Sequence, residues 1–116
     1  MVKANPETVQ LVEDLLEALA ELRKVTRATE LTVRKALKLA KEGADVATAL
    51  DASSPAETRS AMNDALNTVE AARHSMRLRL FRLGLDDGLS IGELGRIFGF
   101  SRQLASRYAK EAKDVD

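Results

Sequence analysis

Three helix start signals divide this chain, and they constrain its fold more than any other feature. Asn5-Pro6-Glu7 combines a residue suited to the N-cap, a proline at the first helical position and an acid in the first turn. Ser54-Pro55-Ala56-Glu57 and Ser90-Ile91-Gly92-Glu93 both carry the Ser-x-x-Glu pattern of a capping box. The sequence therefore predicts helices that begin close to residues 6, 55 and 91.

Apolar residues recur at helical spacing after the first two of these signals. After Pro6 they are Val9, Val12, Leu15, Leu16, Leu19, Leu22, Val33, Leu37 and Ala40. A threonine-rich stretch, residues 25–32, interrupts this series, so residues 6–42 form either one helix or two. After Pro55 the expected buried stripe is Met62, Leu66, Val69, Met76, Leu80 and Leu83, with Ala65 and Ala72 between them. We expect a short helix at 44–50, a loop at 51–54, and Gly84 at the end of the long helix.

Composition supports an all-α fold. Hydrophobic residues make up 45% of the 116 residues but aromatic residues only 3%, so we expect a core of Leu, Val, Ala and Met. Residues 1–70 are predicted to form a long helical hairpin or small bundle that dimerises. Residues 71–116 are predicted to form a C-terminal tri-helical helix-turn-helix head that binds DNA. The long apolar stripes of the N-terminal helices need a partner face, and this predicts a homodimer.

Several classes of function are disfavoured by residues that the chain lacks. It has no cysteine, which excludes a disulfide framework and a thiolate metal site, and a single histidine, His74, cannot form a multi-histidine centre. No glycine-rich phosphate loop follows a strand, and no nucleophile has a nearby base. We expect neither an enzyme nor a bound cofactor or metal. Without a bilayer-spanning apolar run or a signal-peptide pattern, we expect a cytoplasmic protein at the nucleoid, with no membrane partner.

Charge is distributed unevenly, although the whole chain is neutral. Residues 71–116 carry nine basic and six acidic side chains, a net charge of +3, and residues 1–70 therefore carry −3. A basic C-terminal part fits a nucleic-acid-binding module. Four of these nine basic residues form a basic stretch before the start signal at Ser90: Arg73, Arg77, Arg79 and Arg82. These arginines either contact phosphates or form an ordinary solvated face.

Residues 88–113 carry the functional prediction. A short helix begins after Ser90, Gly99 permits the left-handed turn that ends it, and Ser101 can cap a second helix. Two helices joined by about three residues with a glycine have helix-turn-helix spacing. The residues expected to face inward are Ile91, Leu94, Phe98, Phe100, Ala105 and Tyr108, with the small Gly95 where the helices cross. The outward face of the second helix is then Arg102, Gln103, Ser106, Arg107 and Lys110.

The segment from Phe81 to Ala112 resembles the region-4 promoter-binding module of primary bacterial sigma factors. The resemblance covers about the last third of the chain and includes Gly84-Leu85-Asp86-Asp87-Gly88, Glu93, Gly95, Gly99, Ser101 and Arg102. It implies that Arg102, Gln103 and Arg107 face bases in the major groove. Ser106 and Lys110 are placed closer to phosphates, and we add to these backbone contacts Ser90, Ser101, Arg77 and Arg79.

Three residues depart from the pattern of that family: Leu104, Ala105 and Tyr108. We expect a small bacterial regulator rather than a sigma factor, one that binds double-stranded DNA sequence-specifically and controls transcription. Two alternatives remain open. The chain is either a protein-interaction module that docks on RNA polymerase or another partner through an exposed Leu104, or an architectural protein of the nucleoid.

Overall fold

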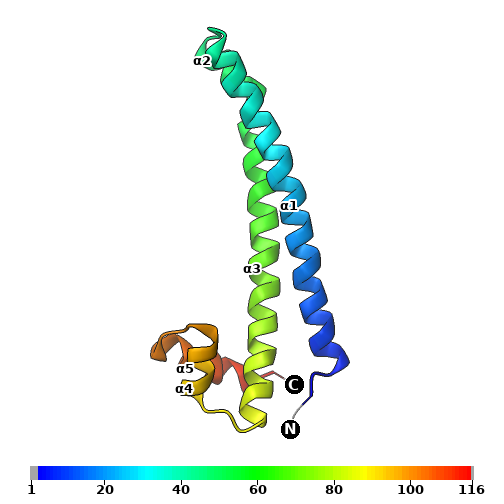
Figure 1. The fold of residues 1–116 in the computed structure, drawn as a ribbon, viewed down its shortest axis with the longest axis vertical. Helices are drawn as coiled ribbons and strands as arrows, with labels where there is room; N and C mark the ends of the chain where they lie inside the picture. The colour runs from blue at the N-terminus through cyan, green and yellow to red at the C-terminus, as the bar shows by residue number, and fades with distance from the viewer. Residues whose placement is uncertain (1–2, 116) are drawn as a thin grey trace. The chain divides into compact units, whose positions relative to one another are not determined.

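The computed structural model describes residues 3–115, and within them it contains five α-helices and no strand. The helices are α1 (Pro6–Lys41), α2 (Val46–Ser53), α3 (Pro55–Asp86), α4 (Ile91–Phe98) and α5 (Arg102–Ala112) (Figure 1). The predicted all-α class is confirmed. Met1 and Val2, at the start of the first predicted domain, and Asp116, at the end of the second, lie outside the described residues.

Two compact units make up the chain. The central unit is Leu16–Glu70. The terminal unit combines the N-terminal segment through Leu15 with the chain from Ala71 onward. Helices α1 and α3 each contribute to both units. None of the helices within residues 3–115 has the length and apolar character that a membrane span needs.

α1 is a single helix, which answers the question left open by the threonine-rich stretch. Its start is capped as predicted, because the Asn5 side-chain oxygen accepts hydrogen bonds from the Thr8 backbone N–H at 2.9 Å and hydroxyl at 2.8 Å. The Thr29 hydroxyl donates to the carbonyl of Val25 at 2.8 Å, and the Thr32 hydroxyl donates to the carbonyl of Thr29 at 2.9 Å. These threonines therefore bond to the helix backbone instead of interrupting it.

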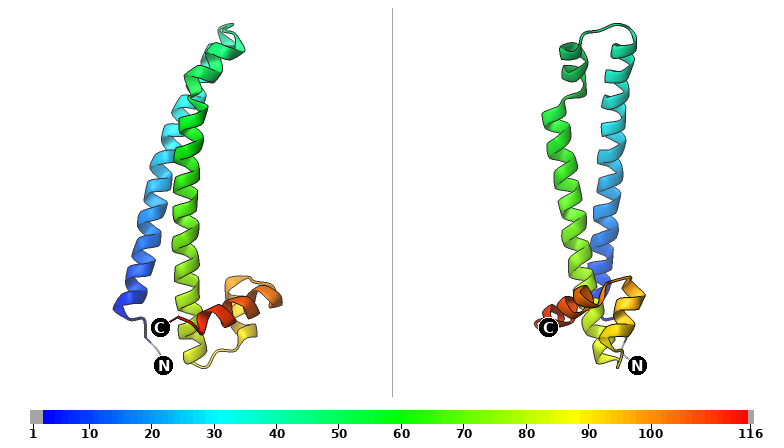
Figure 2. Two further views of the ribbon diagram at one scale, coloured as in Figure 1. Left: turned by 180° about the vertical axis from the view of Figure 1, so that it is seen from behind. Right: turned by 90° about the vertical axis from the view of Figure 1, so that its left-hand side faces the viewer.

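In the central unit, α1 and the first half of α3 run antiparallel side by side, joined through α2 (Figures 1 and 2). Small and β-branched residues fill the space between them, with Ala18, Ala65 and Val69 buried. Leu66, which the predicted stripe placed inside, is instead 45% exposed. The inward row of α3 in this unit therefore depends on Ala65 and Val69 rather than on Leu66.

The connection from α2 to α3 is shorter than predicted. α2 continues through Ser53, so most of the expected loop at 51–54 is helical. Ser54 alone joins the two helices, with a left-handed backbone at φ 45°, and its N–H donates to the carbonyl of Asp51 at 3.2 Å. The N-terminus of α2 is capped by Asp45, whose carboxylate accepts the Thr48 N–H at 2.8 Å. Hydrogen bonding with the Thr48 side chain, and then with its backbone N–H, lowers the pKa of the Asp45 carboxyl below its usual range.

The prediction that Gly84 ends the long helix is wrong, because α3 continues through Asp86. A Cβ atom at Gly84 would lie 2.6 Å from Cδ2 of Leu94, so this glycine permits close packing of α4 on α3. Gly88 provides the helix end instead, with φ +91° and its N–H bonded to the carbonyl of Leu85 at 3.1 Å. The Leu89 N–H bonds back to the carbonyl of Gly84 at 2.9 Å, which completes a Schellman motif.

The core of the terminal unit is aromatic, contrary to the expectation from composition. All three phenylalanines and the single tyrosine of the chain gather there around Phe81, which is fully buried. The Phe81 ring centroid lies 5.4 to 6.0 Å from those of Phe98, Phe100 and Tyr108. Further buried members of this core are Leu94, Ala105, Ala109 and Ala112. A low aromatic fraction therefore describes the whole chain but not this unit, where the few aromatic residues are concentrated.

Candidate nucleic-acid interface

α4 and its N-terminal cap are positioned by local hydrogen bonds. The Ser90 hydroxyl oxygen accepts the Glu93 N–H at 3.0 Å, and the Ser90 N–H donates to the Glu93 carboxylate at 3.4 Å. The predicted capping box is therefore confirmed. Both hydrogen bonds join residues only three positions apart, which is why the pattern could be recognised from the sequence.

The turn from α4 to α5 contains three residues, Gly99, Phe100 and Ser101. Gly99 has φ +72°, a conformation that glycine adopts without steric cost. The Phe100 N–H bonds to the carbonyl of Gly95 at 2.8 Å, and the Ser101 hydroxyl oxygen caps α5 by accepting the Leu104 N–H at 3.2 Å. The chain reverses within this turn, so α4 and α5 pack against each other.

Small residues allow this close packing. A Cβ atom at Gly95 would lie only 3.1 Å from the Cβ of Ala105, and Ala105 is 1% exposed. The predicted role of Gly95 at the crossing is thereby confirmed. The sigma-factor pattern has a larger residue where this chain has Ala105. In this chain the small Ala105 side chain packs directly against Gly95.

α5 has two clearly different faces. Its inward face contains the buried Ala105, Tyr108, Ala109 and Ala112. The opposite face contains the five side chains predicted to be outward: Arg102, Gln103, Ser106, Arg107 and Lys110, all exposed. Three of these are basic and none is acidic. The structure thus brings together on one helix face the three predicted base-contacting residues and two of the predicted backbone-contacting residues.

A shallow groove between α4 and α5 extends this exposed face. Gly92 and Gly95 line it without side chains, and Arg96 and Arg102 contribute two positive charges to its lining. Ser106 lies on the α5 side of the same groove. An anionic group that approached here would meet two cations and little steric obstruction.

Arg77 and Arg79, predicted to contact the DNA backbone, both lie on α3 and have partners within the terminal unit. The Arg77 guanidinium lies 5.3 Å from the centroid of the Phe100 ring, a cation–π distance. Arg79 forms an ion pair with Glu7 at 3.4 Å, and its side chain is only 15% exposed. A phosphate contact by Arg79 would require this pair to exchange, so its predicted role depends on a rearrangement that Arg102 and Arg107 do not need.

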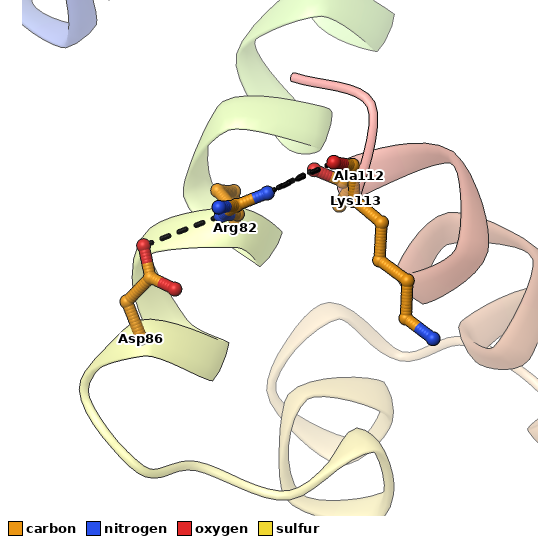
Figure 3. A network of polar contacts seen from close by, with 4 residues as sticks. All are labelled: Arg82, Asp86, Ala112 and Lys113. Atoms are coloured by element: carbon orange, nitrogen blue, oxygen red, sulfur yellow. Dashed lines mark hydrogen bonds and ion pairs between the residues drawn. The ribbon is translucent and has the colours of Figure 1, made fainter. Parts of the chain in front are cut away.

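Arg82, another member of the basic stretch, links α3 to the end of α5. Its guanidinium donates to the carbonyls of Ala112 at 3.3 Å and Lys113 at 3.0 Å, and to the Asp86 carboxylate at 3.3 Å (Figure 3). These carbonyls belong to the C-terminal turn of α5, where no intrahelical donor remains. Arg82 therefore holds the candidate interface in place rather than forming part of it. These contacts join residues at least thirty positions apart, so they could not be predicted from the sequence.

His74 makes a second link between the same helices that the sequence did not reveal. Its Nδ1 lies 3.1 Å from the Tyr108 hydroxyl, and its Nε2 lies 3.3 Å from the Glu111 carboxylate. Through these contacts, α5 is attached to α3 by polar groups as well as by the aromatic core.

Leu104 is not the exposed apolar contact that the protein-interaction alternative required. It is partly buried and packs against the aromatic core. Ile91, expected to face inward, is 40% exposed, and Ile97 is 67% exposed. The apolar surface available in this region therefore lies on α4 and not on α5.

Within residues 3–115, no three His, Cys, Asp or Glu side chains are arranged to hold a metal ion. No protein-family model matches the chain, and no significant match was found among curated proteins or solved structures. The resemblance to sigma region 4 is therefore a prediction from the quoted residues alone.

Proposed function

We propose that the chain is a sequence-specific DNA-binding regulator of transcription in which α4 and α5 form a helix-turn-helix and α5 enters the major groove. The observation that carries the proposal is the outward face of α5, with five exposed hydrogen-bonding side chains, three of them basic and none acidic. A helix with one apolar face in a core and one cationic face toward solvent suits insertion into a DNA groove.

The side chains of this face divide by chemistry. Arg102 and Arg107 can each form bidentate hydrogen bonds with guanine, and Gln103 can do so with adenine. Ser106 and Lys110 suit the phosphate backbone. Ser90 and Ser101 use their hydroxyl oxygens as helix caps but keep their hydroxyl protons for donation to a phosphate. Arg77 and Arg79 remain proposed contacts with the DNA backbone. Arg79 would have to exchange its ion pair with Glu7 for one with a phosphate.

The test is selection of bound sequences from random double-stranded DNA by the full chain, followed by affinity measurements on the enriched site. Arg102→Ala and Arg107→Ala should each weaken specific binding by about 5- to 150-fold, the equivalent of ~1–3 kcal/mol per bidentate contact. Arg59→Ala is the matched control, because it removes an exposed arginine from the central unit. Its affinity should equal that of the unaltered chain.

Three results would contradict parts of the proposal. No retardation of DNA at low salt would refute DNA binding. Binding without enrichment of any sequence would refute a sequence-specific regulator and favour an architectural DNA-binding protein. Unchanged affinity of both arginine variants for the selected site would refute the assignment of α5 as the contacting helix.

The exposed Ile97 favours a second candidate, a protein-docking function of α4. An isoleucine that is 67% exposed beside the charged Arg96 is suited to an apolar contact with another protein, such as RNA polymerase. Ile97→Asp should then abolish binding to purified RNA polymerase and leave DNA affinity unchanged. Retained polymerase binding in this variant would refute the docking role of Ile97.

A further inference from the structure

A second row of exposed residues, apolar at its two ends, follows α1 in the central unit beside the row that packs on α3. Its positions alternate three and four residues apart and are Leu16, Leu19, Arg23, Thr26, Glu30, Val33 and Leu37, all exposed. On an α-helix, these seven positions share one face. Leu16 is 62% exposed, and Val33 and Leu37 are each 53% exposed. We call this row the outer stripe.

The outer stripe has the spacing of a coiled-coil seam, and at its Val33 and Leu37 end it lines a shallow apolar groove beside α2. Its apolar residues lie at its two ends, whereas Arg23, Thr26 and Glu30 occupy the middle. The row is therefore symmetric about a point near Thr26 and Arg27. If a second copy of the row is turned end for end about this point, Leu16 meets Leu37 and Arg23 meets Glu30.

Charge along α1 supports the same arrangement. The first part of the helix, residues 6–22, contains five acidic side chains and no basic one, whereas residues 23–41 contain seven basic side chains and one acidic one. Two parallel copies would place like charges beside each other along the whole helix. Two antiparallel copies place the acidic part of each helix beside the basic part of the other.

We infer that the occupant of the outer stripe is a second copy of this chain, bound antiparallel about a two-fold axis near Thr26. Leu16 and Leu19 of one copy then pack against Val33 and Leu37 of the other. Arg23 of each copy then pairs with Glu30 of the other, so the interface contains two such ion pairs. Glu30 also makes an exposed contact of 3.9 Å with Arg34 in its own helix. Such an interface is isologous, as closed dimers require. It does not depend on the proposed DNA binding.

Sedimentation equilibrium of the full chain tests the surface. The unaltered chain should be a dimer at tens of micromolar, and Leu37→Glu should weaken association at least about a hundredfold, because it places a charge in an apolar contact. Leu31→Glu is the matched control. Leu31 is 65% exposed on the same helix but lies about 110° around it from the outer stripe, so association should be unchanged.

Charge exchange tests the pairing. Arg23→Glu and Glu30→Arg should each weaken association about tenfold, because each places like charges together. The double variant R23E/E30R should restore the original affinity to within about threefold, since the pair is then re-formed with opposite polarity. Within one helix these two residues lie about two turns apart, so the rescue would be intermolecular.

Orientation is tested with cysteines, which the chain itself lacks. Under mild oxidation, L16C/L37C should form covalent dimers, whereas Leu16→Cys alone and Leu37→Cys alone should not. The two positions lie about 32 Å apart along one helix, so a disulfide within one chain is impossible. A monomeric unaltered chain at 100 μM, cross-linking of either single variant with itself, or failure of the R23E/E30R rescue would overturn the inference. Loss of DNA binding in Arg102→Ala with dimerisation intact would separate this interface from the proposed function.

Discussion

The two units of the chain bury their apolar residues to very different extents. In the terminal unit, Phe81 and Ala112 are fully buried and Ala105 is 1% exposed. In the central unit, the buried apolar residues are the small or β-branched Ala18, Ala65 and Val69. Eight of the eleven large apolar side chains that are exposed within the described residues belong to the central unit. The terminal unit therefore has a core of its own, whereas the central unit leaves large apolar side chains exposed at its surface.

The largest effect is expected from Phe81→Ala, which removes the centre of the aromatic core. We expect a loss of about 3–5 kcal/mol in the free energy of unfolding, from lost burial and the cavity left behind. Urea denaturation would measure this loss, and amide hydrogen exchange of α4 and α5 would locate it. Leu66→Ala in the central unit should lose less than about 1 kcal/mol, because Leu66 is 45% exposed. Equal losses in both variants would contradict the contrast between the units.

A smaller effect is expected at Gly84, where the Leu94 side chain of α4 packs against α3. Gly84→Ala adds a Cβ atom 2.6 Å from Leu94, so we expect thermal unfolding to show a loss of about 1–3 kcal/mol from overpacking. Gly92→Ala is the matched control. A Cβ atom there lies 3.9 Å from the nearest side-chain atom, so the higher helix propensity of alanine should add up to about 1 kcal/mol. Stabilisation by both substitutions would show that Leu94 moves aside freely.

The smallest effect is expected from Asp45, the exposed cap of α2. Its pKa is lowered in the folded chain by the hydrogen bonds from Thr48, so the carboxylate stabilises α2 fully above the usual carboxyl range. This stabilisation is lost as the pH falls through the lowered pKa. Asp45→Asn should retain the cap without this dependence on pH, and Asp45→Ala should lose the cap at every pH. Helicity followed by circular dichroism during an acid titration distinguishes the three proteins.

The features that were predicted correctly are encoded within a few residues of sequence. The caps at Asn5, Ser90 and Ser101 and the left-handed Gly99 depend on neighbours no more than four residues away, and the structure has them as expected. The exposed face of α5 followed from helical periodicity in the same way. The proposed role of this face in DNA binding is based on the chemistry of its side chains.

Features that depend on distant residues could not be predicted. Gly84 has the residue type of a helix end, but its position is explained by Leu94 on the next helix. The contacts of Arg82 with the end of α5, and of His74 with Tyr108, join residues at least thirty positions apart. Composition likewise gave an average over the chain, and so it did not reveal that all four aromatic residues share one core.

The position of Tyr108 has a practical consequence for spectroscopy. The chain contains no tryptophan and one tyrosine, and that tyrosine, like every phenylalanine, lies in the core of the terminal unit. Intrinsic fluorescence and near-ultraviolet circular dichroism therefore arise from this unit alone. A tryptophan introduced in the central unit would give that unit a separate optical signal, so the unfolding of each could be followed in one sample.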